Sequence, residues 1–294
     1  MDARDIKELP PVVEDGRYLE AIYSLQKELI DHYVGIEGLP QYPLDVNTKK
    51  NQSIIKDFVG RVIEELAEGY ESFKLVENLT HKNLFWVGEF NPSEYKQMLN
   101  HLQNANEEQA DALHFMIELL IFANIQPEDI VNYCKIQINN LPKNVIHFFE
   151  DEDLNSALSL SGQVGSILLK LDNDYELPDE KNYVRLFNHL DSDTGVNVRL
   201  MLAGSVYSRV EYSNLKLFMW DIVYHLNIAR NYLKNKPWKQ SQMMTNEAAF
   251  QEELVKAFIK LIGYFFNLGL TSEDIYYLYF KKQRVNKFRI HSNY

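Results

Sequence analysis

The stretch EEQADALHFMIELL, residues 107–120, joins an acidic start to an apolar run that is typical of a buried helix. Its acids Glu108 and Asp111 are three residues apart, so a helix places them on one face. A carboxylate in apolar surroundings is costly unless it is paired with a cation or bound to a metal. The stretch therefore predicts a core helix whose first acids either face water or share a cation.

Helical periodicity extends from this stretch in both directions and dominates the chain. Apolar residues recur at spacings of three and four over 17–35 and over 53–75. Pro127 suits the first position of a helix, and Thr271 suits a helix cap. No stretch alternates convincingly as a strand does, so we predict an all-α fold, a helical bundle. The predicted helices are 17–35, 53–75, 93–104, 106–124, 127–139, 153–171, 180–190, 196–208, 212–234, 247–268 and 272–288, with loops at 36–52 and 172–180.

The chain also resembles itself. EEQADALHF (107–115) is similar to EELVKAFIK (252–260) at an offset of 145 residues, and RVIEELAE (61–68) is similar to DIVYHLNI (221–228). Most acids persist only in the first copy, so we interpret one copy as carrying chemistry and the other as structural. The first-copy residues Glu64, Glu65, Glu68 and Asp111 correspond to Tyr224, His225, Ile228 and Lys256.

These similarities predict the domain organisation. We expect a single all-α domain over residues 1–294 made of two related units, the second of them degenerate. The first, over 17–140, is the catalytic helical unit with the metal motifs. The second, over 196–294, carries a basic C-terminal segment.

Composition limits the classes of partner. The 294 residues are 46% hydrophobic, enough for a sizeable core, and the net charge is −12. Such a charge argues against nucleic-acid and anionic-membrane surfaces, but it permits a small phosphorylated ligand held through metal ions. One cysteine, Cys134, fits a reducing compartment, and the charged start has no apolar signal core. We expect a soluble, cytoplasmic protein with no nucleic-acid or membrane partner.

The acids of the first copy are spaced for a shared site. Glu65 and Glu68 lie three residues apart on one predicted helix, and Glu108 and Asp111 lie three apart on another. Two antiparallel helices can aim all four carboxylates into one gap, where they repel strongly. Raised pKa values or hard divalent cations relieve that repulsion, and Mg²⁺ prefers oxygen ligands. The metal ligands that we predict are Glu65, Glu68, Glu108 and Asp111, with Mg²⁺ as the ion and Mn²⁺ as a substitute.

Five segments, which follow one another along the chain in the family's order, carry a resemblance to a known family. EELAE (64–68) followed by EEQAD (107–111) resembles the EExxE…ExxD signature of the all-α NTP pyrophosphatase superfamily, which includes the MazG-type pyrophosphohydrolases and the dimeric dUTPases. LQKELI (25–30), ALHF (112–115) and YFKKQRVNKFRIHSNY (279–294) resemble further motifs of the dimeric dUTPases. The resemblance spans most of the chain and implies a dimeric-dUTPase/MazG-like bundle.

The resemblance also implies an activity. The implied activity is Mg²⁺-dependent hydrolysis of a deoxynucleoside triphosphate into the monophosphate and pyrophosphate. The expected substrate is dUTP. By position, Glu68 is the candidate to orient or deprotonate the attacking water, with Glu65 beside it. Gln26 matches a base-side or sugar-side contact. The tail motif supplies the residues expected to bind phosphate and nucleotide, Lys282, Asn286, Arg289 and Tyr294.

Several alternatives stay open at this point. Ile30 stands where the family's first motif usually has Asn, so we expect weaker discrimination against dCTP if that position faces the ligand. A relative acting on dCTP or another nucleotide, or a non-enzymatic helical binding protein, fits the same fold. His114 is interpreted as a packed core residue, and Lys282 and Arg289 also suit an ordinary basic helix end. The resemblance favours a homodimer.

Overall fold

The computed structural model describes residues 6, 8–13, 16–37, 41–84, 92–137, 141, 145, 148–149, 211–235, 238, 240–268 and 270–292. Within these residues the protein is all-α, with seven helices and no strand, which confirms the predicted fold class. The predicted helices 153–171, 180–190 and 196–208 and the loop 172–180 lie outside the described residues. The helices are α1 (Tyr18–Glu37), α2 (Lys49–Leu84), α3 (Pro92–Phe122), α4 (Pro127–Ile136), α10 (Glu211–Tyr232), α11 (Glu247–Asn267) and α12 (Ser272–His291).

Two of the predicted helix ends are confirmed by their local chemistry. Pro127 opens α4. Thr271 caps α12: its hydroxyl accepts from the N–H of Asp274, and the Asp274 carboxylate accepts from the N–H of Thr271. These reciprocal bonds satisfy backbone donors that the first helical turn leaves without partners.

Several predicted helix boundaries were wrong. Residues 93–104 and 106–124 form the single helix α3, because Ala105 is fully buried and nothing in the sequence there breaks a helix. The predicted loop 36–52 is shorter than expected, since α1 continues to Glu37 and α2 begins at Lys49. The early start of α2 follows from Thr48, whose hydroxyl accepts from the N–H of Asn51 at 3.3 Å.

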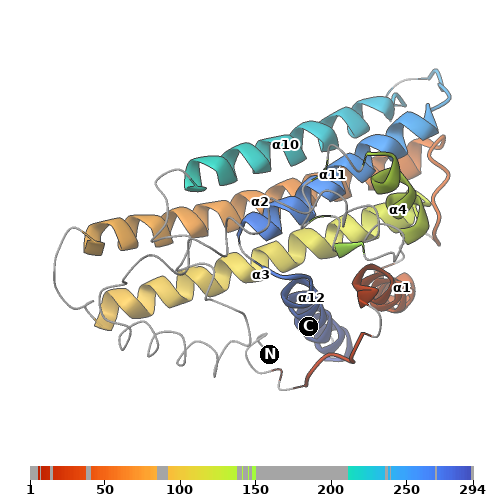
Figure 1. Ribbon diagram of the computed structural model, residues 1–294. Coiled ribbons are helices and arrows are strands. Elements are labelled where there is room, and N and C mark those ends of the chain that lie inside the picture. Colours follow the sequence, from red (N-terminus) through yellow and green to blue (C-terminus); the bar gives the residue numbers. More distant parts are fainter. Residues whose placement is uncertain are drawn as a thin grey trace.

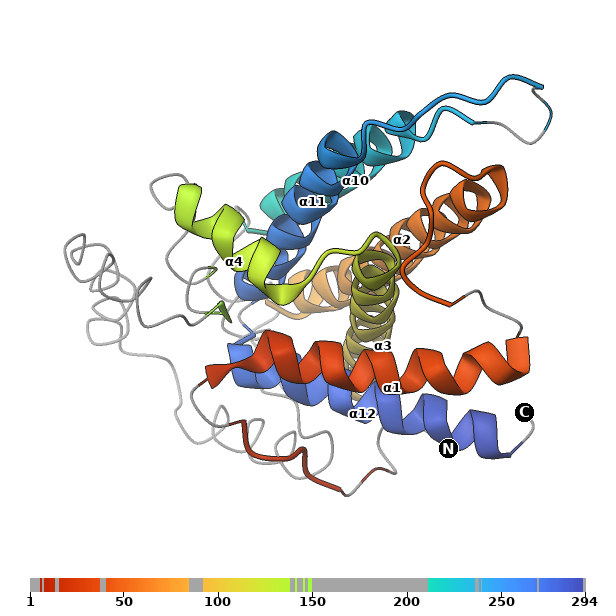
Figure 2. The same ribbon diagram turned by 90° about the vertical axis from the view of Figure 1, so that its right-hand side faces the viewer.

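The long helices lie in pairs. α2 packs along α3, and α10 packs along α11, with all four running roughly lengthwise in Figure 1. The chain reverses direction between α2 and α3, so that pair is antiparallel. Helices α1 and α12 form a third pair that crosses the others steeply, as Figure 2 shows most clearly. Both α1 and α12 contact α3, which also contacts α2 and α11.

The apolar half of the opening stretch lies in the core. Leu113, Met116 and Leu120 are at most 1% exposed, and Phe122 packs edge-on against Phe58 with ring centroids 5.1 Å apart. Burial of these side chains against α2 fixes the face of α3 that turns inward. Of the described helices, none alone is long and apolar enough to span a membrane; only α11 and α12 taken together, as a bent pair, meet that length and composition test.

A close approach between α2 and α3 gives the first testable prediction. A Cβ added at Gly69 meets the amide nitrogen of buried Gln109, whose side chain is held by Tyr264 at 3.4 Å. Gly60, on the same helix, has nothing within 4 Å of an added Cβ. We expect Gly69→Ala to lower the free energy of unfolding by about 1–3 kcal/mol. The matched control Gly60→Ala should raise it by up to about 1 kcal/mol.

Urea unfolding of both variants measures this difference. Because both changes remove a helical glycine, they share the same gain in helix propensity. Shifts of the same sign and size would contradict the tight packing at Gly69.

Candidate functional site

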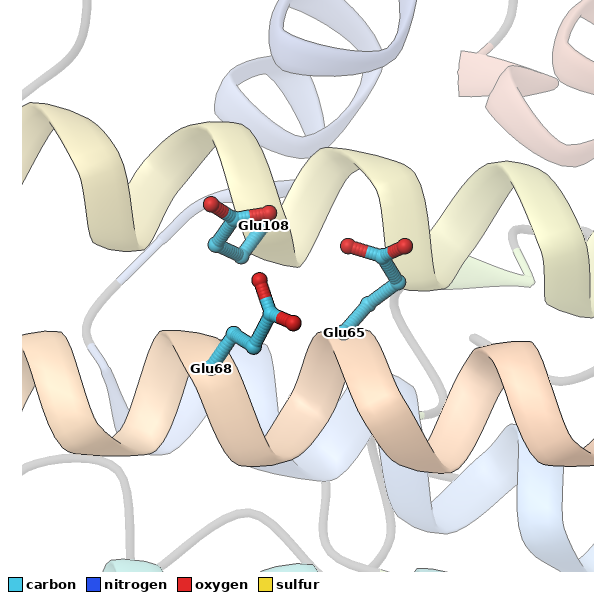
Figure 3. A group of neighbouring side chains, drawn as sticks. All are labelled: Glu65, Glu68 and Glu108. Atoms are coloured by element: carbon cyan, nitrogen blue, oxygen red, sulfur yellow. The ribbon is translucent and has the colours of Figure 1, made fainter.

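Three of the predicted metal ligands converge at the α2–α3 contact. Glu65 and Glu68 project from α2 and Glu108 projects from α3, and the three carboxyl groups point toward one another across the gap (Figure 3). One oxygen of each lies within 4.8 Å of the others. Glu65 and Glu108 are half-buried, while Glu68 is exposed. We call these three residues the acidic cluster.

The fourth predicted ligand, Asp111, lies outside this cluster and has a cation of its own. The Lys282 ammonium on α12 is 2.6 Å from a carboxylate oxygen of Asp111, and the side chain of Lys282 is only 9% exposed. Asp111 still lies near enough for its charge to raise the pKa values of Glu65 and Glu108. The structure therefore has three acids together and a fourth beside them, neutralised by a lysine that we had predicted to bind phosphate.

Two carboxyl groups of the acidic cluster, Glu65 and Glu108, have raised pKa values. Burial, a hydrogen bond with Glu108 and the charges of Asp111, Glu108 and Glu68 raise the pKa of Glu65 to about 8. Burial also raises the pKa values of Glu108 and Asp111, and for Asp111 the Lys282 ammonium opposes the rise. Clustered carboxylates of this kind either share protons or take up a cation. Their oxygen atoms are the donors that hard divalent cations prefer.

This electrostatic arrangement predicts a pH-dependent stability. Between pH 4.5, the ordinary carboxyl pKa, and about 8, the folded chain retains a proton on Glu65 that the unfolded chain has released. Stability therefore falls as pH rises through this window when no divalent cation is present. We expect the melting temperature of the wild-type chain to drop across the window and Glu65→Gln to flatten the drop.

The control is Glu64→Gln, which changes the neighbouring exposed acid on α2. It should retain the wild-type slope of melting temperature against pH, measured by circular dichroism in the presence of a chelator. An unchanged slope in Glu65→Gln would show that another group governs the pH dependence.

A pocket of about 280 Å³ adjoins the acidic cluster and joins it to residues of α1 and α12. The sequence-predicted residues Gln26, Asn286 and Arg289 line it together with Glu65 and Asp111. Tyr294 lies outside the described residues. The pocket thus brings together most of the residues expected to bind substrate, although they come from distant parts of the chain. Its remaining lining residues are Leu29, Tyr33, Phe58, Arg61, His114, Phe115 and Glu118.

Gln26 sits at the centre of a buried hydrogen-bond network. Its side-chain oxygen accepts from the hydroxyl of Tyr279 and lies 3.0 Å from Nδ1 of His114, and its nitrogen donates to Glu118 at 3.2 Å. Tyr279 and Glu118 were not singled out from the sequence. Glu118 is the one acid within the apolar run ALHFMIELL (112–120). An acid in such a run could have indicated a buried polar contact.

Two expectations about this region have clear outcomes. His114 is buried, as predicted for a packed histidine, and its ring stacks on Tyr279 with centroids 3.9 Å apart. Ile30 is fully buried and is not among the residues that line the pocket. The condition for weaker discrimination against dCTP, that Ile30 faces the ligand, is therefore not met, because this side chain of α1 lies in the core.

In the sequence comparison, Glu65, Glu108 and Asp111 align with His225 of α10 and with Glu253 and Lys256 of α11, so the second set includes basic residues. Nδ1 of His225 lies 2.8 Å from Glu253, and the Lys256 ammonium lies 2.7 Å from the same carboxylate and 2.8 Å from Glu252. The lysine and the histidine lower the pKa of Glu253 despite its partial burial. These groups neutralise one another within the protein, whereas the acidic cluster has no comparable cation among the described residues.

Comparison of the chain with protein-family models, with curated proteins and with solved structures found no match. The functional argument therefore rests on the residues and geometry of the site.

Proposed function

We propose that the protein is a Mg²⁺-dependent deoxynucleoside triphosphate diphosphatase that converts dUTP into dUMP and pyrophosphate. The observation that carries the proposal is the shared pocket: the acid Glu65 of the cluster, the amide Gln26 and the guanidinium of Arg289 all border it. A nucleoside triphosphate has a matching layout, with a base at one end and an anionic chain at the other. The resemblance to the dimeric dUTPases supports the same assignment and adds a homodimer in the cytoplasm to the proposal.

The donor set fits a hard divalent cation. Glu65, Glu68 and Glu108 would hold it, and Asp111 would join them once Lys282 moves to a substrate phosphate. Bound Mg²⁺ would neutralise phosphate charge and help orient the attacking water. Mn²⁺ has similar oxygen preferences and should substitute. The raised pKa values of Glu65 and Glu108, caused by burial and by the charges of neighbouring carboxylates, support this choice of ligand.

The remaining chemistry belongs to side chains of this chain. Glu68, the exposed acid of the cluster, would orient a water molecule and accept its proton. The water oxygen bonds to the α-phosphorus, the bond from that phosphorus to the α–β bridging oxygen breaks, and pyrophosphate leaves. Arg289 and Lys282 stabilise negative charge that develops on the phosphate oxygens. Asn286, also on α12 and lining the pocket, contributes a neutral donor.

We further propose one catalytic site per chain. In α10 and α11 the corresponding positions hold His225 and Lys256, whose nitrogen atoms lie 2.8 Å and 2.7 Å from the Glu253 carboxylate. A divalent cation gains little there, since a lysine ammonium is already paired with the available carboxylates. The α2–α3 pair would then be the catalytic unit, and α10–α11 its structural relative.

Binding of a non-hydrolysable α,β-imido analogue of dUTP tests the proposal. We expect calorimetry to show at least about tenfold tighter binding with Mg²⁺ than with a chelator, because the metal screens the clustered acids from the phosphates. Equal affinity with and without Mg²⁺ would favour a binding protein that does not use the cluster. Stronger binding of the dCTP analogue would favour a relative with another base.

A further inference from the structure

A second pocket, of about 490 Å³, lies between the first half of α2 and the C-terminal end of α10 with the segment that follows it. The two helices contact each other and run along each other in Figure 1. The volume falls in the range of roughly 300–1,000 Å³ that small-molecule sites occupy. The proposed reaction assigns no role to the residues that line this pocket, so its use is open.

The charges in this pocket are opposite in balance to those of the whole chain. Three cations line it, Lys56, Arg61 and Arg230, against two acids, Asp57 and Glu64. In the whole chain acidic residues outnumber Lys and Arg by 42 to 30. Arg61 pairs with Asp57 at 3.0 Å, whereas the guanidinium of Arg230 has no ion pair among the described residues. A guanidinium matches the geometry of a phosphate group, so the pocket favours an anionic ligand.

Gly60 leaves space in the pocket next to the backbone of α2. It lies inside this helix, where glycine is less favourable than alanine. A Cβ added at Gly60 would meet nothing within 4 Å, so close packing does not require a glycine there. Gly69 on the same helix differs, because an added Cβ would meet the side chain of Gln109. A ligand that lies against the backbone of α2 accounts for a glycine at position 60.

The segment that follows α10 is fixed against the start of α2 by Asn235. The side-chain oxygen of Asn235 accepts from the N–H of Met243 at 2.6 Å, and its amide donates to the carbonyl of Asn47 at 3.1 Å. The Lys56 ammonium donates to the backbone carbonyl of Asn235 at 3.0 Å. Trp238, three residues further, lines the same pocket and is 77% exposed. Its indole offers a flat face on which a planar ring can stack.

We propose that this pocket is a second ligand site that binds a nucleoside phosphate, with the phosphate held by Arg230 and Lys56 and the ring stacked on Trp238. A nucleoside phosphate combines the two features that the pocket can recognise, an anionic group and a planar ring. The inference goes beyond the proposed function and does not depend on it. Because the phosphate is bound by protein cations, binding at this site needs no divalent cation, unlike binding at the acidic cluster.

Calorimetry with AMP in the presence of a chelator measures this binding, since the chelator removes any metal from the acidic cluster. We expect Arg230→Met to raise the dissociation constant for AMP by at least about tenfold, because a hydrogen bond to a charged group is lost. Trp238→Ala should raise it by about fivefold or more through loss of stacking. The same variant should leave the dissociation constant of inorganic phosphate unchanged, because phosphate has no ring.

Gly60→Met separates loss of binding from loss of structure. Its side chain would occupy the pocket and lower the affinity for AMP by at least about tenfold. The same change should raise the resistance of the chain to urea, because methionine is a better helix former than glycine. The control is Lys74→Met, about four turns further along α2, where Lys74 pairs with Glu71 at 3.3 Å. It should bind AMP as the wild-type chain does.

The outcomes distinguish this inference from the proposed function. Loss of AMP binding in Arg230→Met and Gly60→Met, in a chain that does not hydrolyse dUTP, would uphold the inference and overturn the activity. Hydrolysis of dUTP with AMP affinity unchanged in both variants would overturn the inference alone. A wild-type chain that does not bind AMP would also overturn it. Inorganic phosphate that binds as tightly as AMP, with no effect of Trp238→Ala, would indicate a simple oxyanion site and overturn the assignment of a nucleoside phosphate.

Discussion

Glu65→Gln should lower the kcat for dUTP hydrolysis by more than about 100-fold, since even residues that only support metal ligands are worth about 10–100-fold. The carboxylate of Glu65 shares the acidic cluster with Glu68 and Glu108 and also lines the pocket. An amide of the same shape keeps the packing but removes a charge that a divalent cation requires. The fold should be retained, and without Mg²⁺ the melting temperature near pH 8 should rise, because mutual repulsion is relieved.

The matched control is Glu64→Gln, one residue earlier on α2. Glu64 is exposed and is not part of the acidic cluster, so its loss should leave turnover near the wild-type value. A parallel pair, Glu108→Gln against Glu107→Gln, repeats the comparison on α3. Near-normal turnover in both Glu65→Gln and Glu108→Gln would rule out a shared catalytic site at this helix contact.

Lys282→Met should have opposite effects on metal binding and on turnover. The Lys282 ammonium neutralises Asp111 at 2.6 Å, where it would compete with the proposed divalent cation. Removing it leaves a carboxylate that is 21% exposed without its partner, so the chain should be less stable without Mg²⁺ and bind Mg²⁺ more tightly. Turnover should nevertheless fall by about 100-fold to 1,000-fold, because a charge that stabilises the phosphate oxygens is lost.

Lys287→Met serves as the control on the same helix. Lys287 pairs with Glu28 of α1 at 2.7 Å, whereas Lys282 pairs with Asp111 beside the acidic cluster. It should alter neither Mg²⁺ affinity nor turnover by more than a small factor. Weaker Mg²⁺ binding in Lys282→Met would contradict the competition between lysine and metal at Asp111.

Local patterns in the sequence predicted much of the helical structure. Apolar spacing located the described helices, and chemistry at Pro127 and Thr271 located two of their ends. The spacing of Glu65 and Glu68 predicted that both lie on one face of α2, and in the structure Glu108 of α3 lies beside them. The break expected at 105 was wrong because no residue there interrupts the helix, and burial of Ala105 favours its continuation.

Contacts between residues far apart in the sequence could not be predicted from local patterns. The pairing of Lys282 with Asp111 joins residues on different helices, and no local spacing specifies which cation approaches which acid. The same holds for Gln26, which contacts Glu118 and Tyr279 from other helices. Ile30 shows the limit most clearly: its place in a motif suggested a ligand contact, whereas its direction from α1 places it in the core.

The most direct test of the central claim is to follow dUTP by phosphorus NMR in the presence of the wild-type chain and Mg²⁺. We expect equal amounts of dUMP and pyrophosphate, formed with Mg²⁺ or Mn²⁺ and absent when a chelator removes the metal. Unchanged dUTP, or the appearance of dUDP and inorganic phosphate instead, would contradict it.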